Sequence, residues 1–344
     1  MIISRTPFRI SFFGGGTDYP AWYRNHGGVV LGTSIDKYCY LTCRYLPPFF
    51  SYRHRIVYSQ VELANSVEEI QHPAVRGVLQ EMNIQQGLEI HHDADLPARS
   101  GLGSSSTFTV GLIHALEALH GRMISKKDLA ERAVYIEQEV LKETVGCQDQ
   151  ILAAFGGFNL IRFQPNDTYD IASIILQNDR LMELQSHLML FFTGYTRFAS
   201  EIAKTLIENF ENRRRELQEM QAMTYQAMQI LENSRTSLDE FGKLLHESWK
   251  LKRSISEKVS NPTLDEIYER AQAAGATGGK VLGAGGGGFM LFFVPLEYQA
   301  QVREALKELI HVPFQFDFSG SKIVVYEPNG FPTERKISFL PASR

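Results

Sequence analysis

Apolar and polar residues alternate along several short stretches of the first hundred positions. Such alternation favours β-strands, because successive side chains of a strand point to opposite faces. The strands expected on this basis are residues 2–13, 29–35, 38–45, 56–61 and 88–94. A helix is expected from His72-Pro73-Ala74 to Met82, since proline is favoured at the first helical position. The N-terminal half therefore begins rich in strands.

From residue 104 onward, apolar residues recur every three or four positions, which predicts amphipathic helices. The stretches with this period are residues 104–119, 125–140, 199–233, 237–257, 262–275 and 297–310. Shorter apolar runs predict strands at residues 187–193, 314–318 and 322–326. The turn-forming run Gln164-Pro165-Asn166-Asp167 interrupts the pattern, so we expect a domain boundary between residues 165 and 180.

The stretch from Leu96 to Ile113 has the layout of a phosphate site. Its loop, residues 96–106, is called the nucleotide loop below. Gly101 and Gly103 let backbone amides approach an anion closely, and the helix that opens at Ser104 adds free N–H groups and a positive dipole end. Serine hydroxyls donate further hydrogen bonds, and one can bind magnesium. Taken alone, the stretch would also fit an ordinary turn that caps a helix.

Neither of two common nucleotide-binding loops is present. The sequence has no Gly-x-x-x-x-Gly-Lys-Ser/Thr loop, and no Gly-x-Gly-x-x-Gly follows a first strand with an acidic residue in the dinucleotide position. A phosphate site in this chain therefore requires a different architecture.

Composition narrows the choice of partner. The 344 residues are 44% hydrophobic and 22% charged, as in an ordinary globular protein, and a net charge of −4 gives no bulk attraction to nucleic acid. Apolar runs fall short of the roughly 20 residues that span a membrane, and the N-terminus lacks a signal-peptide layout. Three cysteines without a Cys-x-x-Cys pair favour reduced thiols. We expect a cytoplasmic protein that acts on a small molecule.

Two further glycine-rich stretches lie at the ends of predicted strands. Gly14-Gly15-Gly16 leads to Thr17 and Asp18, and an aspartate accepts hydrogen bonds from neighbouring hydroxyls of a polyol. The run Gly285–Gly288 lies between two apolar strands, and four consecutive glycines cost considerable backbone entropy. A purely structural role is therefore less favoured for this run than for a single glycine.

Two acidic residues of the N-terminal half have less common positions. Glu137 lies beside the apolar stripe of its predicted helix and not on the polar face. Asp149 lies at the start of a short helix that ends at Gly156-Gly157, a position where aspartate is commonly a structural cap.

The three glycine-rich stretches, in this order, resemble the motifs of the GHMP kinase superfamily, named for galactokinase, homoserine kinase, mevalonate kinase and phosphomevalonate kinase. Residues 96–106 resemble the family's Pro-x-x-x-Gly-Leu-Gly-Ser-Ser-Ala nucleotide loop, with Ser106 replacing the final alanine. Pro7 to Tyr19 resembles the first motif of the sugar kinases, and Gly283 to Phe289 resembles the third motif. The resemblance covers nearly the whole chain.

The resemblance implies a two-domain α+β fold. Residues 1–170 are expected to form an ATP-binding domain similar to domain 2 of ribosomal protein S5, and residues 171–344 a ferredoxin-like α+β domain. ATP and the acceptor would lie between the domains, with Mg²⁺ as a second cofactor. The resemblance implies no nucleic-acid or membrane partner, and it leaves the oligomeric state open between monomer and homodimer.

The resemblance also gives individual residues roles. Asp149 matches the aspartate that takes the acceptor's proton or orients its hydroxyl, and Arg9 matches an arginine that neutralises charge near the transferring phosphoryl group. Glu137 and Ser105 match the magnesium ligands. The separation from Glu137 to Asp149 is one residue longer than in mevalonate kinases, so Glu139 is an alternative ligand. The residues expected to bind ATP are Ser100, Gly101, Leu102, Gly103, Ser104, Ser105 and Ser106.

The acceptor side departs from the galactokinase pattern. There Glu and His precede the Thr-Asp pair, whereas Gly15 and Gly16 stand here. This string and the turn Gly194-Tyr195-Thr196-Arg197 most resemble the bacterial D-glycero-D-manno-heptose 7-phosphate kinases and, less closely, fucokinase domains. The absence of these two side chains makes room for a longer, phosphorylated sugar. Cationic side chains would bind the phosphate of that sugar. The residues expected to bind this substrate are Gly15, Gly16, Thr17, Asp18, Arg197, Lys280, Gly285, Gly286 and Gly287.

The expected reaction is transfer of phosphate from ATP to the anomeric hydroxyl of heptose 7-phosphate, which gives the 1,7-bisphosphate for nucleotide-activated heptose synthesis. Another sugar 1-kinase, such as a fucokinase or a galactokinase-like enzyme, is an alternative. The Thr17-Asp18 pair favours a polyol over the acids used by mevalonate or homoserine kinases. A catalytically silent nucleotide or sugar sensor is the non-enzymatic alternative. Arg99, Lys37 or Arg44 could replace either cation in holding the substrate phosphate.

Overall fold

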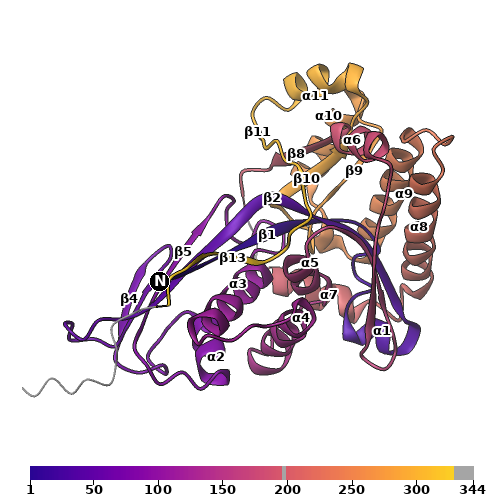
Figure 1. Ribbon diagram of the computed structural model, residues 1–344. Coiled ribbons are helices and arrows are strands. Elements are labelled where there is room, and N and C mark those ends of the chain that lie inside the picture. Colours follow the sequence, from indigo (N-terminus) through magenta and orange to yellow (C-terminus); the bar gives the residue numbers. More distant parts are fainter. Residues whose placement is uncertain (196–198, 329–344) are drawn as a thin grey trace, which may run out of the picture.

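The computed structural model describes residues 1–195 and 199–328, and within them the strands form two sheets (Figure 1). The first sheet contains β1 (Ile2–Phe13), β2 (Gly28–Tyr45), β3 (His54–Val57), β4 (Val61–Ala64), β5 (Leu88–Ala94), β6 (Phe158–Phe163), β7 (Tyr169–Ser173), β12 (Phe316–Asp317) and β13 (Lys322–Tyr326). The second sheet contains β8 (Leu188–Phe192), β9 (Gly278–Val281), β10 (Phe289–Phe293) and β11 (Ile310–His311). The two-domain α+β fold expected from the sequence is confirmed.

The strand β2 organises the first sheet, because it pairs with different neighbours along its two halves. Residues 28–33 pair with β6 and residues 39–45 pair with β5, while β1 runs antiparallel beside both halves. The sequence predicts two strands here, but no glycine or proline separates the halves and the strand continues through 18 residues. A register shift between Pro7 and Arg9 on β1 absorbs the irregularity.

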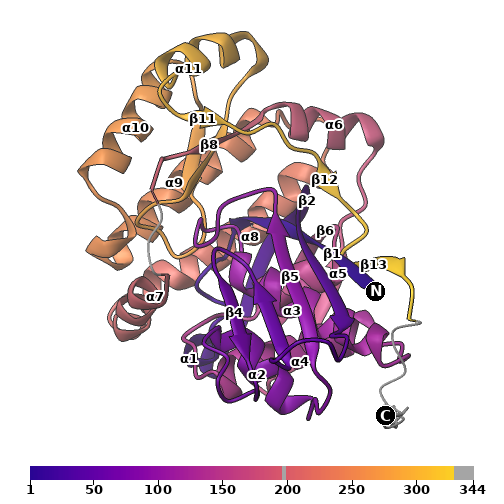
Figure 2. The same cartoon turned by 90° about the vertical axis from the view of Figure 1, so that its left-hand side faces the viewer.

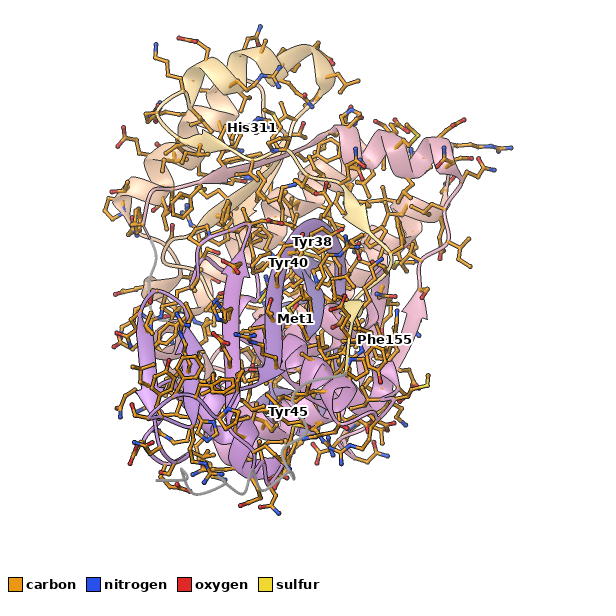
Figure 3. The ribbon with its side chains drawn as sticks, turned by 60° about the vertical axis from the view of Figure 1, so that its left-hand side comes forward. Met1, Tyr38, Tyr40, Tyr45, Phe155 and His311 are labelled. Carbon is orange, nitrogen blue, oxygen red and sulfur yellow. The ribbon has the colours of Figure 1, made fainter. Side chains whose placement is uncertain are left out.

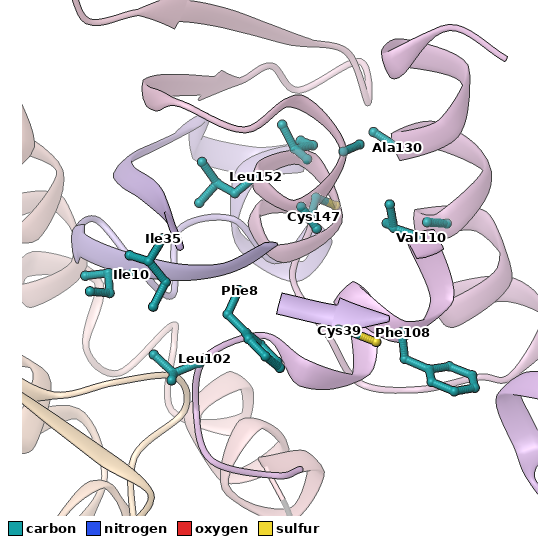
Figure 4. Close-up of a cluster of buried hydrophobic side chains, with 14 of the residues drawn as sticks. Phe8, Ile10, Ile35, Cys39, Leu102, Phe108, Val110, Ala130, Cys147 and Leu152 are labelled. Atoms are coloured by element: carbon teal, nitrogen blue, oxygen red, sulfur yellow. The ribbon is translucent and has the colours of Figure 1, made fainter. Parts of the chain in front are cut away.

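Helices cover one face of the first sheet, as Figure 1 shows for α2, α3 and α4. The first sheet and its helices are called the N-terminal unit below, and the second sheet and the helices after β7 the C-terminal unit. The helices of the N-terminal unit are α1 (Pro20–His26), α2 (Pro73–Glu81), α3 (Ser104–Leu119), α4 (Lys126–Tyr135) and α5 (Gln148–Phe155). The apolar sides of α2 to α5 meet the sheet in one core, where Phe8 and Ile10 of β1 lie near Leu102, Val110 and Leu152 (Figure 4). This packing holds the starts of α3 and α5 in place.

The remaining helices follow β7 in the chain. They are α6 (Asn178–Ser186), α7 (Ala199–Glu208), α8 (Arg214–Glu232), α9 (Asp239–Ile255), α10 (Pro262–Ala273) and α11 (Gln299–Ala305), with short 3₁₀ turns η2 (Glu257–Val259) and η3 (Leu296–Tyr298). Of these helices, α6, α9 and α10 contact the second sheet, whereas α8 contacts α9 and the first sheet. The sequence predicts one helix over residues 199–233, but the structure has two, because the chain turns where Phe210 is buried and Asn209 Nδ2 donates to the carbonyl of Ile255. No helix among the described residues is long and apolar enough to span a membrane.

The end of the described chain returns to the first sheet. Strand β12 pairs with β2, and β13 pairs with β1 beside the N-terminus (Figure 2). Residues 316–326 therefore belong with the N-terminal unit, although the sequence places them in the C-terminal domain. The boundary between residues 170 and 171 stays a prediction. Figure 3 shows the length of β2, with Tyr38, Tyr40 and Tyr45 in turn along the N-terminal unit and His311 on the other unit.

Candidate active site

Arg9 on β1 and Asp149 in the first turn of α5 form a bidentate ion pair. Arg9 Nε and Nη2 donate to the two carboxylate oxygens of Asp149, both at 2.7 Å. Arg9 Nη1 donates to the carbonyl oxygen of Gly101 at 2.6 Å, which ties the pair to the nucleotide loop. The Arg9 side chain is buried, whereas the Asp149 side chain is 25% exposed. The carboxylate is thus fixed by two charge-assisted hydrogen bonds and still accessible to a hydroxyl.

The nucleotide loop leads into a helix end without a side-chain cap. Helix α3 begins at Ser104, directly after Gly103, whose φ of +78° lies in the left-handed region that favours glycine. The N–H of Thr107 donates to the carbonyl of Gly103 as the first helical hydrogen bond. The N–H groups of Ser104 to Ser106 therefore have no acceptor within the helix. This end of α3 can bind an anion such as a phosphate chain.

Glycines let the nucleotide loop touch the loop between β9 and β10, residues 282–288, through its backbone. A β-carbon on Gly101 would lie 2.5 Å from the carbonyl oxygen of Leu282, and one on Gly288 would lie 2.1 Å from that of Ser100. The N–H of Phe289 donates to the carbonyl of Ser100 at 3.0 Å. The two glycine-rich loops are therefore one packed unit, and a side chain at either position would separate them.

Gly285, Gly286 and Gly287 of this loop pack against the C-terminal unit. The N–H of Gly286 donates to the carbonyl of Val259 at 2.8 Å, and a β-carbon on Gly285 would lie 2.5 Å from the same oxygen. A β-carbon on Gly287 would lie 2.7 Å from the ring of Tyr195. Close packing thus explains why glycine stands at these three positions. The expected contact of these glycines with a substrate stays a prediction.

Glu137 lies in a π-helical turn, η1 (Ile136–Val140), that continues α4. A π turn holds one residue more than an α-helical turn, which agrees with the longer spacing between Glu137 and Asp149. The Oε2 atom of Glu137 accepts hydrogen bonds from Ser106 Oγ at 2.8 Å and from Gln150 Nε2 at 2.5 Å. Its Oε1 atom has no partner among the described residues. Complete burial raises the pKa of this carboxyl to about 7.

This environment fits a magnesium ligand, because a buried carboxylate oxygen without a partner suits a hard cation. The serine hydroxyl that contacts Glu137 belongs to Ser106, however, while Ser105 is exposed on α3. Glu139 is also exposed and pairs with Lys142, so the structure favours Glu137 over Glu139. No cluster of three or more His, Cys, Asp or Glu side chains suited to a metal occurs in residues 1–195 and 199–328. A cation at Glu137 would therefore also need oxygens from bound phosphates.

The loop after β1 buries the two polar residues expected to bind the substrate. The Oγ1 atom of Thr17 lies 2.8 Å from the carbonyl oxygen of Gly14 and 3.0 Å from that of Val29, and it accepts from the Val29 N–H. Thr17 is fully buried and closes the loop, so the expected contact with substrate is not supported. Asp18 accepts hydrogen bonds from the N–H groups of Gly16 and Gln148. Burial, and to a smaller extent Asp149, raises the pKa of Asp18.

Of the two cationic side chains expected to bind a substrate phosphate, the structure describes only one. Lys280 on β9 is buried, and its Nζ donates to the carbonyl oxygens of Ser11 and Phe12 at 2.8 and 2.9 Å. Burial lowers the pKa of Lys280 well below its usual value. Lys280 therefore fixes the end of β1, and its expected contact with a substrate phosphate stays a prediction. Arg197 lies outside the described residues.

Lys252 on α9 is a buried cation of this site that the sequence interpretation missed. Its Nζ donates to the carbonyl oxygen of Gly283 at 2.5 Å, and Arg9, Asp18 and Asp149 are near enough to act on its charge. Burial first, and Arg9 second, lower the pKa of Lys252 to about 8. The signal in the sequence was its place on the apolar side of α9, shared with Trp249, where lysine is uncommon.

Comparison with known proteins identifies two matching domains. The pattern described as GHMP kinases N terminal domain matches residues 65–157, and the pattern described as GHMP kinases C terminal matches residues 227–311. The first match contains the nucleotide loop, Glu137 and Asp149, and the second contains Lys252 and the loop between β9 and β10.

Several relatives are similar to the chain over most of its length. The D-glycero-alpha-D-manno-heptose 7-phosphate kinase of Campylobacter jejuni is 31% identical over 93% of this chain and 97% of its own. The crystal structure of a D-glycero-D-manno-heptose 1-phosphate kinase from Bacteroides thetaiotaomicron is 27% identical, with a TM-score of 0.75 over 93% of this chain and 98% of its own. The bifunctional fucokinase/GDP-fucose pyrophosphorylase of Arabidopsis thaliana is 24% identical over 88% of this chain, which spans 31% of that protein.

Proposed function

This chain belongs to the GHMP kinases and is a sugar kinase, and we propose that it transfers phosphate from ATP to the anomeric hydroxyl of D-glycero-D-manno-heptose 7-phosphate. The product would be the 1,7-bisphosphate. The observation that carries the proposal is the position of the Arg9–Asp149 pair. A β-carbon on Gly103 would lie 3.3 Å from Arg9 Cγ and 3.2 Å from Asp149 Oδ2. The carboxylate and the anion-binding end of α3 are therefore neighbours.

In the proposed reaction, Asp149 orients the anomeric hydroxyl for in-line attack on the γ-phosphorus of ATP and receives its proton. The new bond joins the sugar oxygen to phosphorus, and the bond between phosphorus and the β,γ-bridging oxygen breaks to leave ADP. Arg9 fixes both oxygens of Asp149 and places positive charge beside the transferring group. The open N–H groups at the start of α3 would bind the phosphate chain.

We propose that Glu137 holds a magnesium ion together with a hydroxyl of Ser105 or Ser106. Such an ion would neutralise charge on the phosphates. Gln150 and Ser106 fix the carboxylate of Glu137, and its free oxygen is the atom that would bind the cation. Comparison of Ser105→Ala with Ser106→Ala distinguishes the two hydroxyls, because the serine that binds the cation should raise the magnesium requirement when it is replaced.

Lys252 is proposed to stabilise negative charge on the transferring phosphoryl group. It approaches the ion pair from α9, on the other unit of the molecule, and its hydrogen bond to Gly283 fixes it beside the loop between β9 and β10. A lysine without a carboxylate partner in direct contact retains its charge for a ligand. Asp18 remains a proposed acceptor of hydrogen bonds from the sugar.

The identity of the acceptor is supported by the relatives. Both the Campylobacter and the Bacteroides relatives carry heptose phosphate kinase in their names, although the first names a 7-phosphate and the second a 1-phosphate. The relatives therefore support a heptose phosphate as the acceptor, and the position of its phosphate at carbon 7 is our own proposal. Arg197 remains the proposed cation for that phosphate, since Lys280 is committed to the backbone of β1. We also propose a cytoplasmic location, where ATP is supplied.

The test is a phosphorylation screen with magnesium and ATP over sugars and sugar phosphates, in which NMR locates the new phosphate. Turnover of heptose 7-phosphate to the 1,7-bisphosphate with the highest kcat/KM is the expected result. Turnover of heptose 1-phosphate at its far end, or of an unphosphorylated sugar, would contradict the proposal.

A fucokinase activity is the second candidate, because two bifunctional proteins with fucokinase in their names match 88% of the chain at 24 and 26% identity. Fucose carries no phosphate, so this candidate needs no phosphate-binding cation. Fucose is therefore included in the screen.

A further inference from the structure

Two buried side chains beside the catalytic groups have polar atoms without partners. Ser11 is 4% exposed and Gln148 is 8% exposed. Ser11 Oγ and Gln148 Oε1 nevertheless make no hydrogen bond within the described part of the chain. Buried polar groups are nearly always paired, because an unpaired group loses its hydration without compensation. Two such groups side by side in an enzyme indicate a place where a ligand completes the pairing.

Both side chains converge on Gly15. A β-carbon at this position would lie 3.3 Å from Ser11 Oγ and 3.6 Å from Gln148 Nε2. The neighbouring Gly14 and Gly16 have φ values of +78° and +113°, so their backbone conformation favours glycine, whereas Gly15 does not have a positive φ. Glycine at position 15 is therefore not required by the backbone. Its effect is that no side chain of residue 15 occupies the space beside the polar groups of Ser11 and Gln148.

The same two residues adjoin the groups that carry out the reaction. Ser11 follows Arg9 by two residues on β1 with continuous register, so both side chains lie on one face of the strand. Gln148 directly precedes Asp149, and its N–H donates to Asp18 Oδ2 at 3.3 Å. Lys280 Nζ holds the carbonyl of Ser11, which fixes the backbone and leaves the hydroxyl uncommitted.

We propose that Ser11 Oγ and the Gln148 amide bind a hydroxyl of the acceptor that is not phosphorylated, and so determine which polyols the enzyme accepts. Both groups are uncharged, and a serine hydroxyl and an amide oxygen can each accept a hydrogen bond from an alcohol. The pair therefore suits a sugar hydroxyl, which can donate to one of these groups and accept from the other. This assignment rests on the proposed function only in taking a polyol as the acceptor.

The test compares Ser11→Ala and Gln148→Leu with Ser4→Ala. Ser4 is a matched control, because it is a buried serine of the same strand whose Oγ already donates to the carbonyl of Gly111 at 2.8 Å. The probe is the best acceptor from the phosphorylation screen, with magnesium and ATP. The measurements are kcat/KM for the acceptor, KM for ATP and the thermal unfolding temperature.

The first two variants are expected to lower kcat/KM for the acceptor by about threefold to tenfold each, without lowering the unfolding temperature or changing KM for ATP. Ser4→Ala should do the reverse, lowering the unfolding temperature and leaving kcat/KM unchanged. If Ser11→Ala and Gln148→Leu lose stability and keep the wild-type kcat/KM, the two side chains have a structural role and the proposal is wrong.

Deoxy sugars identify the hydroxyl that is bound. Wild-type enzyme should lose a similar factor on the analogue that lacks it, and Ser11→Ala should lose little more on the same analogue, because the interaction is already gone. Equal losses in both enzymes on every analogue would contradict the assignment. Failure of the proposed function is distinguishable, since the screen would then favour another sugar, on which the same comparison is made.

Discussion

Gly103 lies directly against the carboxylate of Asp149, so that a β-carbon on Gly103 would come within 3.2 Å of Asp149 Oδ2. The residue before α3 thus touches the first turn of α5. A phosphate bound at the start of α3 is consequently close to any hydroxyl held by Asp149. In the proposed reaction, the transferring phosphate and the acceptor hydroxyl would lie between these two helix starts.

Asp149→Asn is expected to lower kcat by at least a hundredfold, while the Kd for ATP changes by no more than a few-fold. The amide cannot take the acceptor's proton, and the ATP-binding groups of α3 do not involve it. Asp167→Asn is the matched control, because Asp167 also accepts a hydrogen bond from an arginine Nε at 2.7 Å, but on the surface with Arg24. Near-normal turnover in Asp149→Asn would refute the assignment.

Gly101→Ala is expected to weaken ATP binding by more than tenfold and to destabilise the protein by about 2 kcal/mol or more. The added β-carbon would clash with the carbonyl oxygen of Leu282, and the backbone of residue 101 would have to keep a φ of +84°. Gly121→Ala isolates the conformational part, since Gly121 has a φ of +69° but nothing within 4 Å of the added carbon. The control should cost only about 1 kcal/mol and leave ATP binding unchanged. Equal effects would show that the contact between the loops does not matter.

Glu137→Gln is expected to raise the magnesium concentration needed for half-maximal turnover, since an amide is a poorer ligand for a hard cation than a carboxylate. The exposed Glu139 supplies the control, and Glu139→Gln should leave the magnesium requirement unchanged. The opposite pattern would move the magnesium site to Glu139.

The same variant should stabilise the ligand-free protein at neutral and alkaline pH. The pKa of Glu137 is about 7 in the folded protein against an ordinary value of 4.5, so the folded state binds more protons between these pH values. Folding stability therefore falls as the pH rises from about 4.5 to 7. A glutamine does not titrate, so its advantage in unfolding temperature should be absent near pH 4 and complete by pH 8. A constant difference across this range would contradict the pKa shift.

Lys252 is expected to couple ATP binding to proton uptake. Its pKa is about 8 in the folded protein and 10.5 ordinarily, so stability rises between these pH values as the buried charge is lost from the folded state. Bound phosphates would raise the pKa again, so wild-type enzyme should take up protons on binding ATP near pH 8.5. Calorimetry in two buffers of different ionisation enthalpy measures this uptake. Lys252→Met should remove it, whereas Lys250→Met, at an exposed lysine two residues away, should not.

The repeating elements of the fold were predictable, because periodicity is a local property. The division of residues 199–233 was not, since the apolar pattern continues through Phe210 and the turn depends on a contact with Ile255 in another helix. The return of residues 316–326 to the first sheet was also missed. This segment pairs with β1 and β2, which lie about 300 positions earlier in the sequence, and no local pattern encodes such a partner.

Within the site, the glycine-rich loops were predictable because their spacing reflects what the backbone itself must do. The hydrogen bonds of Thr17 and Lys280 were not, since each is made to a main-chain carbonyl of a distant residue, Val29 and Ser11 respectively. A polar side chain next to a motif has the right chemistry for a substrate, and only the three-dimensional structure shows whether its hydrogen bonds are already used.

Selectivity for a phosphorylated acceptor is expected to depend on Arg197 and not on Lys280. A charge-assisted hydrogen bond to phosphate contributes roughly 1.5 to 3 kcal/mol, so Arg197→Ala should reduce the preference for heptose 7-phosphate over free heptose by about one to two decades in kcat/KM. Lys280→Ala removes two hydrogen bonds to the carbonyls of β1, so it should lower the unfolding temperature and leave that preference unchanged.

The decisive quantity is the ratio of kcat/KM for heptose 7-phosphate to that for heptose, measured for wild type and both variants. A ratio rather than a rate is used because loss of folded Lys280→Ala protein lowers both rates equally and cancels. If wild-type enzyme turns over a free sugar as well as its phosphate, no cation recognises the phosphate, and the fucokinase activity becomes the better assignment. If the ratio falls in Lys280→Ala instead, the buried ammonium reaches the substrate by leaving β1, which contradicts its structural role.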